Sequence, residues 1–246
     1  LIRTRPFRAP HHTVSVQALT GGGRRPKPGE ISLATGGILF LDEFPEFSRA
    51  ALETLRQPLE EREVTVSRVE ASVTYPANFQ LVAAMNPCPC GHFPDRSRCR
   101  CTDGQITRYL QKVSGPMLDR IDICVEASPI TYGDIRSSGN NESSREIRAR
   151  VEQARKIQGE RFAGENIRCN GEMSGRHIRK FCWLGREEEK FMEEIFKKLA
   201  LSARMHDRIL KVARTTADLA EEEKIRLADL CEAVSYVKSR DKFWGN

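Results

Sequence analysis

Two adjacent carboxylates, Asp42 and Glu43, follow a short apolar run and give the sharpest chemical signal in the sequence. The run, residues 38–41, has two glycines before it, which is typical of a buried strand in a parallel sheet. Ligands of open α/β sheets bind beyond the carboxyl ends of the strands, where these acids would lie. One carboxylate there can hold Mg²⁺, and its neighbour can activate a water for attack on phosphorus. The alternative is an acidic loop that enters a helix.

Asn86 and Arg120 could complete such a phosphate site. Asn86 ends a second apolar segment, residues 79–85, and its amide could hydrogen-bond a phosphate oxygen or the attacking water. An Asx turn before Pro87 is the alternative interpretation. Arg120 could act as an arginine finger in a neighbouring subunit's site, or could form a surface ion pair with a nearby aspartate.

Four of the eight cysteines form the pattern CxCx₈CxC, at Cys88, Cys90, Cys99 and Cys101. Four thiolates are the right number for tetrahedral Zn²⁺, although the usual knuckle is CxxC, and His92 could replace one of them. The first ten residues show no signal-peptide pattern, so we do not expect a disulfide framework. Structural zinc, redox-sensitive free thiols and a disulfide pair all stay open.

The other histidines and cysteines carry a weaker signal. Adjacent residues point in different directions on a strand or helix, so His11 and His12 are expected to pack or to lie near phosphate rather than to bind a metal. Scattered cysteines usually behave as small buried apolar residues. We expect that of Cys124, Cys169, Cys182 and Cys231.

Basic side chains on glycine- and proline-rich loops suggest contact with a phosphate backbone. Arg24, Arg25 and Lys27 lie in residues 21–30, and Arg68 lies near the turn of an expected hairpin. The formal net charge is +6, which permits a nucleic-acid partner without requiring one. A solvated basic loop is the alternative. No apolar run approaches the roughly 18 residues of a membrane span, so no membrane partner is expected.

The pattern of the first half predicts an α/β arrangement that positions these residues. Strands are expected at residues 38–41, 79–85 and 121–125, with a hairpin over 63–75. Residues 14–19 predict a short helix or strand. Ser48 is a candidate N-cap for a helix whose last turn Pro58 should weaken. Further helices are expected over 105–113 and from Pro116 onward.

The second half predicts only helices. Residues 133–143 are polar and rich in Gly, Ser and Asn, so we interpret them as a linker between an α/β domain, residues 1–132, and a helical domain, residues 144–246. Helices are expected over 144–158, 174–183, 187–201, 202–219 and 225–239. Ser174 and Ser202 are candidate N-caps.

Six long stretches together carry a family resemblance: RPFRAPHHTVS, GGGRRPKPGEISLATGGILFLDE, LRQPLEEREVTVSR, YPANFQLVAAMNPCPCG, SGPMLDRID and LSARMHDRILKVAR. The chain resembles the magnesium-chelatase-like AAA+ ATPases of the ComM/YifB family. The resemblance implies part of an AAA+ parallel sheet with its helices, followed by an all-helical lid. It also implies ATP and Mg²⁺ as ligands.

The resemblance also assigns roles. Asp42 and Glu43 match the Walker B acids, Asn86 matches sensor 1 and Arg120 matches the arginine finger. In the lid, Arg204 matches the segment of the sensor 2 arginine. Arg208, one turn later on the same helix face, is the alternative, because spacing cannot separate the two.

Two insertions of this family point into the central pore of its ring. Here they match residues 21–30 and 64–75, which carry Arg24, Arg25, Lys27 and Arg68. The phosphate-binding pattern GxxxxGK[ST] is missing from this sequence. We therefore expect the chain to begin after the P-loop of a longer protein, without its amino-terminal domain, and to be inactive alone.

The resemblance implies an ATP-driven ring motor, hexameric and cytoplasmic, that acts on DNA as a helicase in branch migration during recombination and natural transformation. Two alternatives stay open. One is a magnesium-chelatase motor subunit that drives the metal into a porphyrin. The other is a non-enzymatic, zinc-stabilised basic binding module.

Overall fold

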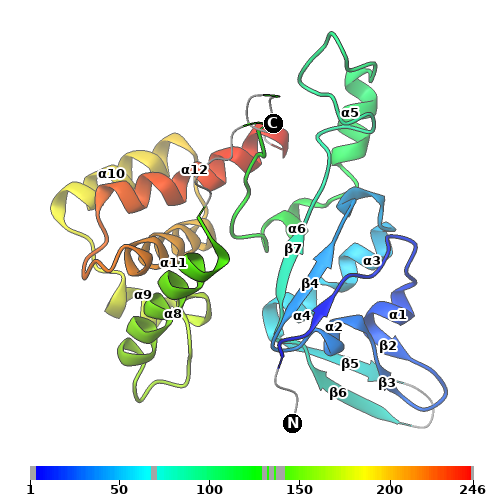
Figure 1. Ribbon diagram of the computed structural model, residues 1–246, viewed down its shortest axis with the longest axis horizontal. Helices are drawn as coiled ribbons and strands as arrows, with labels where there is room; N and C mark the ends of the chain where they lie inside the picture. Colours follow the sequence, from blue (N-terminus) through cyan, green and yellow to red (C-terminus); the bar gives the residue numbers. More distant parts are fainter. Residues whose placement is uncertain (1–3, 68–70, 129–131, 133–135, 137–141, 245–246) are drawn as a thin grey trace. The chain divides into compact units, whose positions relative to one another are not determined.

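A computed structural model describes residues 4–67, 71–128, 132, 136 and 142–244 of the chain. The chain divides into two compact units, one formed by Leu1–Ile121 with Phe243–Asn246 and the other by Asp122–Lys242 (Figure 1). Each unit is described by itself. Arg68 and most of the expected linker, residues 133–143, lie outside the described residues.

The first unit is built on a parallel three-stranded sheet in the order β1-β4-β7. Its strands are β1 (Phe7–Arg8), β4 (Ile38–Leu41) and β7 (Gln80–Ala83) (Figure 1). Leu39 and Leu41 are fully buried on one face of β4, as the apolar run predicts. The strands expected at residues 38–41 and 79–85 are confirmed as β4 and β7, and β1 is an addition that the sequence pattern did not indicate.

Short helices follow the sheet strands of this unit: α1 (Val16–Thr20), α2 (Glu30–Leu33), the 3₁₀ turn η1 (Phe44–Glu46), α3 (Arg49–Thr54) and α4 (Arg56–Glu61). The hydroxyl of Ser48 accepts the Ala51 N–H at 3.2 Å, which confirms the predicted N-cap. The helix breaks at Leu55, so Pro58 lies in the first turn of α4. A missing N–H is tolerated there, because first-turn N–H groups have no intrahelical partner.

Two antiparallel hairpins belong to the same unit: β2 (Gly21–Gly22) with β3 (Lys27–Pro28), and β5 (Glu63–Ser67) with β6 (Ser72–Pro76). The second confirms the expected hairpin. The hydroxyl of Tyr75 donates to the Pro26 carbonyl at 2.9 Å, so the hairpins lie side by side, as Figure 1 also shows. Gly21 has φ +106°, and a Cβ there would lie 2.3 Å from the Lys27 carbonyl oxygen. This position therefore requires glycine.

Beyond β7 lie the cysteine segment, α5 (Asp103–Leu110) and α6 (Gly115–Leu118). The strand expected over residues 121–125 does not form, and residues 121–128 carry neither helix nor strand. Ile123 and Val125 are 51% and 71% exposed. The prediction was wrong because a short apolar run makes a strand only where a partner strand and a covering layer bury it.

The second unit is all helical: α8 (Ser144–Arg161), the 3₁₀ turn η2 (Asn170–Glu172), α9 (Gly175–Phe181), α10 (Arg186–Lys198), α11 (Ala203–Leu219) and α12 (Leu227–Trp244), whose last two residues pack with the first unit. Ser202 caps α11, where its hydroxyl accepts the Met205 N–H at 3.2 Å. Among the described residues, no helix has the length and apolar character that a membrane span requires.

The scattered cysteines behave only partly as expected. Cys182 is buried, Cys124 and Cys169 are half-buried, and Cys231 is exposed. The expectation of burial was wrong for Cys231, which lies on the exposed side of α12.

Candidate functional site

The carboxyl edge of the parallel sheet gathers the predicted acids and the asparagine. Leu41 at the end of β4 pairs with Ala83 at the end of β7, and the Ala84 N–H donates to the Leu41 carbonyl at 3.0 Å. Asp42 and Glu43 leave β4 at this point, and Asn86 follows β7 three residues after Ala83. The two strands are neighbours, which is the condition for Asn86 to lie beside the acids.

Glu43 has a left-handed backbone, with φ 53° and ψ 43°. Its N–H donates to Oδ1 of Asp42 at 2.8 Å, and its carbonyl accepts the Glu46 N–H at 2.7 Å. These two hydrogen bonds hold the backbone of Glu43 in a tight turn directly after β4. Both side chains are exposed, as a site for a soluble metal–phosphate ligand requires. Oxygen ligands of this kind suit Mg²⁺.

Two residues beside these acids were not assigned to the site from the sequence. Nδ1 of His12 lies 2.8 Å from Oε2 of Glu43. The phenol of Tyr109 on α5 lies near the backbone N–H of Asn86, and burial, together with the charges of Glu46 and Glu43, raises the pKa of Tyr109 to about 12. The phenol therefore stays neutral at physiological pH. Both contacts depend on tertiary packing, so no spacing in the sequence indicated them.

Arg120 is held within its own unit. Its Nε donates to the Arg56 carbonyl at 3.0 Å, and the guanidinium also contacts the Pro116 carbonyl and the carboxylate of Glu60. Its side chain is only 10% exposed. These contacts place Arg120 between α4 and α6.

The two lid arginines differ in environment although they share a helix face. Arg204 is exposed in the first turn of α11. Arg208 is buried, and its Nε lies 2.9 Å from Oδ1 of Asp122 in the same unit. Both arginines therefore place a positive charge on α11, but only the guanidinium of Arg204 is exposed to solvent.

The predicted basic loop is the turn of the first hairpin. Arg24 and Arg25 lie in the turn between β2 and β3, and Lys27 begins β3. All three side chains are exposed. The Tyr75–Pro26 hydrogen bond joins this hairpin to the β5–β6 hairpin. The structure thus brings the β2–β3 hairpin, which carries these three residues, beside the β5–β6 hairpin, whose Arg68 lies outside the described residues.

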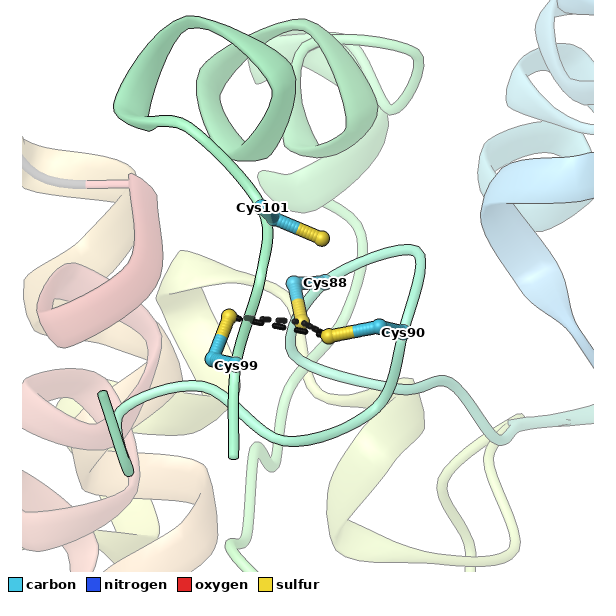
Figure 2. A group of neighbouring side chains, drawn as sticks. All are labelled: Cys88, Cys90, Cys99 and Cys101. Atoms are coloured by element: carbon cyan, nitrogen blue, oxygen red, sulfur yellow. Dashed lines mark hydrogen bonds between the residues drawn. The ribbon is translucent and has the colours of Figure 1, made fainter. Parts of the chain in front are cut away.

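The four clustered cysteines converge on one point, as Figure 2 shows. The sulfur of Cys88 lies 3.4 Å from that of Cys90 and 3.8 Å from that of Cys99, and the Cys90 and Cys99 sulfurs are 3.6 Å apart. All four ligand atoms lie within 4.8 Å of one another. A tetrahedral Zn²⁺ with Zn–S bonds of about 2.3 Å requires S···S distances of about 3.8 Å. The cluster could therefore hold a metal ion.

The thiols of this cluster differ in acidity. The backbone N–H of His92 lowers the pKa of Cys90 to about 6, whereas partial burial raises the pKa of Cys101 to about 11. All eight cysteines lie in the described part of the chain, and each is a free thiol there. Cys88 and Cys99 are buried against Ile106, Tyr109 and Leu110. The cluster thus joins its loop to α5.

Family models match both parts of the chain. The model described as magnesium chelatase, subunit ChlI, covers residues 1–135, and the model described as magnesium chelatase, subunit ChlI C-terminal, covers residues 141–237.

Curated relatives agree with the family models. Competence protein ComM of Haemophilus influenzae is 48% identical over 235 residues, which are 95% of this chain and 45% of the relative. Protein YifB of Escherichia coli is 47% identical over 236 residues, 95% of this chain and 46% of the relative. The magnesium-chelatase 67 kDa subunit of Heliobacterium mobile is 28% identical over 144 residues, 57% of this chain and 20% of that subunit. The chain spans about half the length of the first two relatives. It belongs to the magnesium-chelatase ChlI family of AAA+ proteins, in the group that contains ComM and YifB.

Proposed function

We propose that this chain is part of an ATP-driven AAA+ ring motor that acts on DNA. The observation that carries the proposal is the pair of exposed carboxylates, Asp42 and Glu43, at the carboxyl edge of a parallel sheet in a chain of this family. Asp42 supports Mg²⁺ and Glu43 accepts the proton of the attacking water. Asn86, beyond the neighbouring strand, positions that water or a phosphate oxygen.

Two arginine roles belong to the same proposal. Arg120 serves the site of a neighbouring subunit in the ring, which requires its guanidinium to leave Glu60 and the two carbonyls. Arg204 contacts the γ-phosphate from the lid, and its exposure favours it over the buried Arg208. Replacing Arg120 by alanine should abolish turnover in the assembled ring while nucleotide binding persists. Turnover at the wild-type rate would refute the role in trans.

The DNA part of the proposal rests on the basic hairpin. Arg24, Arg25 and Lys27 put three positive charges on an exposed turn, where they could follow a phosphate backbone without reading sequence. Arg68 is proposed to act with them. The relative from Haemophilus influenzae is named a competence protein, which agrees with a DNA substrate. Helicase action in branch migration, a hexameric ring and a cytoplasmic location complete the proposal.

DNA affinity and its salt dependence test this part. In the full-length protein, replacing all three hairpin residues by alanine should weaken DNA binding and reduce the salt slope by roughly 0.9 per lost phosphate contact. The matched control replaces Lys190, Lys197 and Lys198 of the exposed α10 surface, which removes the same charge. Equal affinity and slope in the hairpin variant and the wild type would refute the hairpin as a DNA contact.

A magnesium-chelatase motor subunit is the second candidate function. The family model and the Heliobacterium mobile relative favour it. The two candidates differ in one readout, because a DNA motor hydrolyses ATP faster with DNA. An ATP hydrolysis rate that single-stranded and branched DNA leave unchanged would favour the chelatase role.

Zn²⁺ is the ion that we propose for the cysteine cluster. Four thiolates at the observed S···S distances match its preferred tetrahedral geometry. Cys88, Cys90, Cys99 and Cys101 would hold it, and the ion would stiffen a loop whose apolar core is small.

A further inference from the structure

Asn86 lies beyond the part of its strand that the sheet holds. Ala84 still belongs to the sheet edge, because its N–H donates to the Leu41 carbonyl and its carbonyl accepts the Phe44 N–H, both at 3.0 Å. Asn86 follows two residues later, in a segment with neither helix nor strand, and it is exposed. The geometry of β7 therefore does not determine where the Asn86 amide points, and a role in positioning water requires further contacts.

The turn of the cysteine loop lies against Asn86. The Gly91 N–H donates to the Cys88 carbonyl at 3.0 Å, which closes a turn that contains Cys88 and Cys90. Gly91 has φ +80°, and a Cβ added to it would lie 3.7 Å from Oδ1 of Asn86. The backbone that carries the first two sulfurs of the cluster thus passes directly beside the Asn86 amide.

Helix α5 contacts Asn86 from the segment that follows the other two cysteines. Cys99 and Cys101 directly precede this helix in the chain. The Tyr109 phenol on α5 lies near the backbone N–H of Asn86. Tyr109 is only 5% exposed, so its packing fixes the place of the phenol. The position of α5 is therefore linked to the position of the Asn86 backbone.

A second contact joins the end of α5 to the turn that follows the two acids. Nζ of Lys112, two residues beyond the helix, lies 2.8 Å from Oε2 of Glu46 in η1. The Glu46 N–H in turn donates to the Glu43 carbonyl at 2.7 Å. The same Lys112 ammonium lies 5.6 Å from the centre of the Tyr109 ring. The α5 segment thus contacts the residues that follow β7 and those that follow β4.

The four sulfurs lie where the turn and the helix segment meet (Figure 2). Cys88 and Cys90 come from the turn beside Asn86, and Cys99 and Cys101 come from the segment that leads into α5. Thiols are weak hydrogen-bonding groups, and the apolar cluster around these four is small. Thiolates this close repel one another unless a cation lies between them. A bound metal ion would therefore supply the cross-link between the two segments.

We propose that the metal-bound cysteine cluster positions Asn86, with Tyr109 as the contact, so that ATP hydrolysis depends on a metal ion outside the Mg²⁺ site. The inference rests on the proposed ATP hydrolysis and on the metal proposed for the cluster. The ion holds the turn and α5 together, and these two segments fix the amide and the backbone of Asn86. Without the ion, the amide samples other orientations, and the attacking water lies in line with the γ-phosphorus less often.

The test uses the full-length protein that contains this chain, with Mg-ATP as substrate and Zn²⁺ as the metal probe. A chelator removes zinc, dialysis removes the chelator, and Mg²⁺ is then restored. We expect kcat to fall roughly 10- to 100-fold, while the affinity for a fluorescent ADP analogue stays within about twofold of its starting value. Added Zn²⁺ should restore kcat. Cys99→Ser should show the same loss, which added Zn²⁺ should not reverse.

Tyr109→Phe tests the contact without changing the metal ligands. Loss of this one hydroxyl should lower kcat roughly 3- to 10-fold, which corresponds to about one hydrogen bond, at unchanged zinc content. Tyr236→Phe is the matched control, because its hydroxyl donates to Glu232 within α12, and kcat should stay within about twofold. In an Asn86→Ala background, zinc removal should cause no further loss, since groups that act through one residue are not additive.

Hydrogen exchange gives a readout that does not depend on turnover. In the zinc-free protein, peptides that cover β7 and end at Asn86 should exchange at least about threefold faster. Peptides from the β5–β6 hairpin should exchange at an unchanged rate and serve as the internal standard.

Each result supports or overturns the inference. An unchanged kcat in the zinc-free protein or in Tyr109→Phe overturns it and leaves the proposed hydrolysis standing. An equal further loss in the Asn86→Ala background, or a fall in nucleotide affinity that matches the fall in kcat, also overturns it. A wild-type protein that hydrolyses ATP but binds no zinc overturns the proposed metal and the inference. A wild-type protein without turnover overturns the proposed function and the inference together.

Discussion

Replacing Asp218 by alanine should destabilise the helical unit more than any surface change. Asp218 on α11 is fully buried. Its carboxylate accepts hydrogen bonds from both terminal nitrogens of Arg161, from Nε of Arg214 at 3.0 Å and from Asn170 at 2.7 Å. Arg214 is itself buried, with 2% exposed, and also donates to the Glu223 carbonyl at 2.7 Å. The carboxylate is therefore the counter-charge of two guanidinium groups.

The cost follows from what the alanine leaves behind. Removing one partner of a buried ion pair costs about 3–5 kcal/mol, because the other charge stays desolvated. Arg161 is 13% exposed and can regain some hydration, so Arg214 carries most of this cost. An increase of 1.4 kcal/mol changes an opening equilibrium tenfold, so amide exchange limited by unfolding of this unit should accelerate roughly 10²- to 10⁴-fold.

Hydrogen exchange measured by mass spectrometry reads this unit separately. Peptides from α8 and α11 should exchange faster in Asp218→Ala, while peptides from β4 and α3 of the other unit serve as an internal standard. Asp207→Ala on the same helix is the matched control, since Asp207 is 43% exposed and should change stability by less than about 0.5 kcal/mol. A cost below about 1 kcal/mol for Asp218→Ala would refute the reasoning.

Three further predictions follow from single sites. Gly21→Ala should lower the free energy of unfolding by about 1–3 kcal/mol, measured by urea unfolding, because φ is +106° and the added Cβ meets a carbonyl. Gly104→Ala, with open space around the added Cβ, should leave this free energy unchanged or raise it. Burial raises the pKa of Cys182 to about 12, so only roughly 10⁻⁴ of this thiol is thiolate at pH 8. Cys182 should therefore resist iodoacetamide while the exposed Cys231 reacts, and equal labelling of the two would contradict this. Cys99→Ser should reduce bound zinc well below one equivalent per chain by elemental analysis, whereas Cys231→Ser should keep it; unchanged zinc in Cys99→Ser would exclude the proposed site.

Local patterns predicted the elements that are determined by nearby residues. The strand before Asp42, the cap at Ser48 and the hairpin of β5 and β6 all follow from short-range signals and are confirmed. The apolar run at residues 121–125 carried the same signal as a strand and formed none. Strand formation there depended on partners that the run itself does not encode.

The candidate site also contains some features that local patterns predicted and others that they did not. The placement of Asp42, Glu43 and Asn86 was predictable because each follows an apolar strand, and the carboxyl ends of neighbouring parallel strands meet at one edge of the sheet. The contact of His12 with Glu43 was not predictable, because the strand β1 has only two residues in a proline-rich segment, and only the pairing with β4 reveals its register. The cysteine spacing suggested a metal site, and the S···S distances in the structure support it.

ATP hydrolysis by the full-length protein, compared with its Glu43→Gln variant, tests the proposed motor most directly. The wild type should turn over ATP faster with DNA. Glu43→Gln should lose roughly 10²- to 10⁴-fold of that turnover while it still binds nucleotide, because the amide cannot accept the proton of the attacking water. Turnover in Glu43→Gln equal to that of the wild type would contradict the role of this carboxylate.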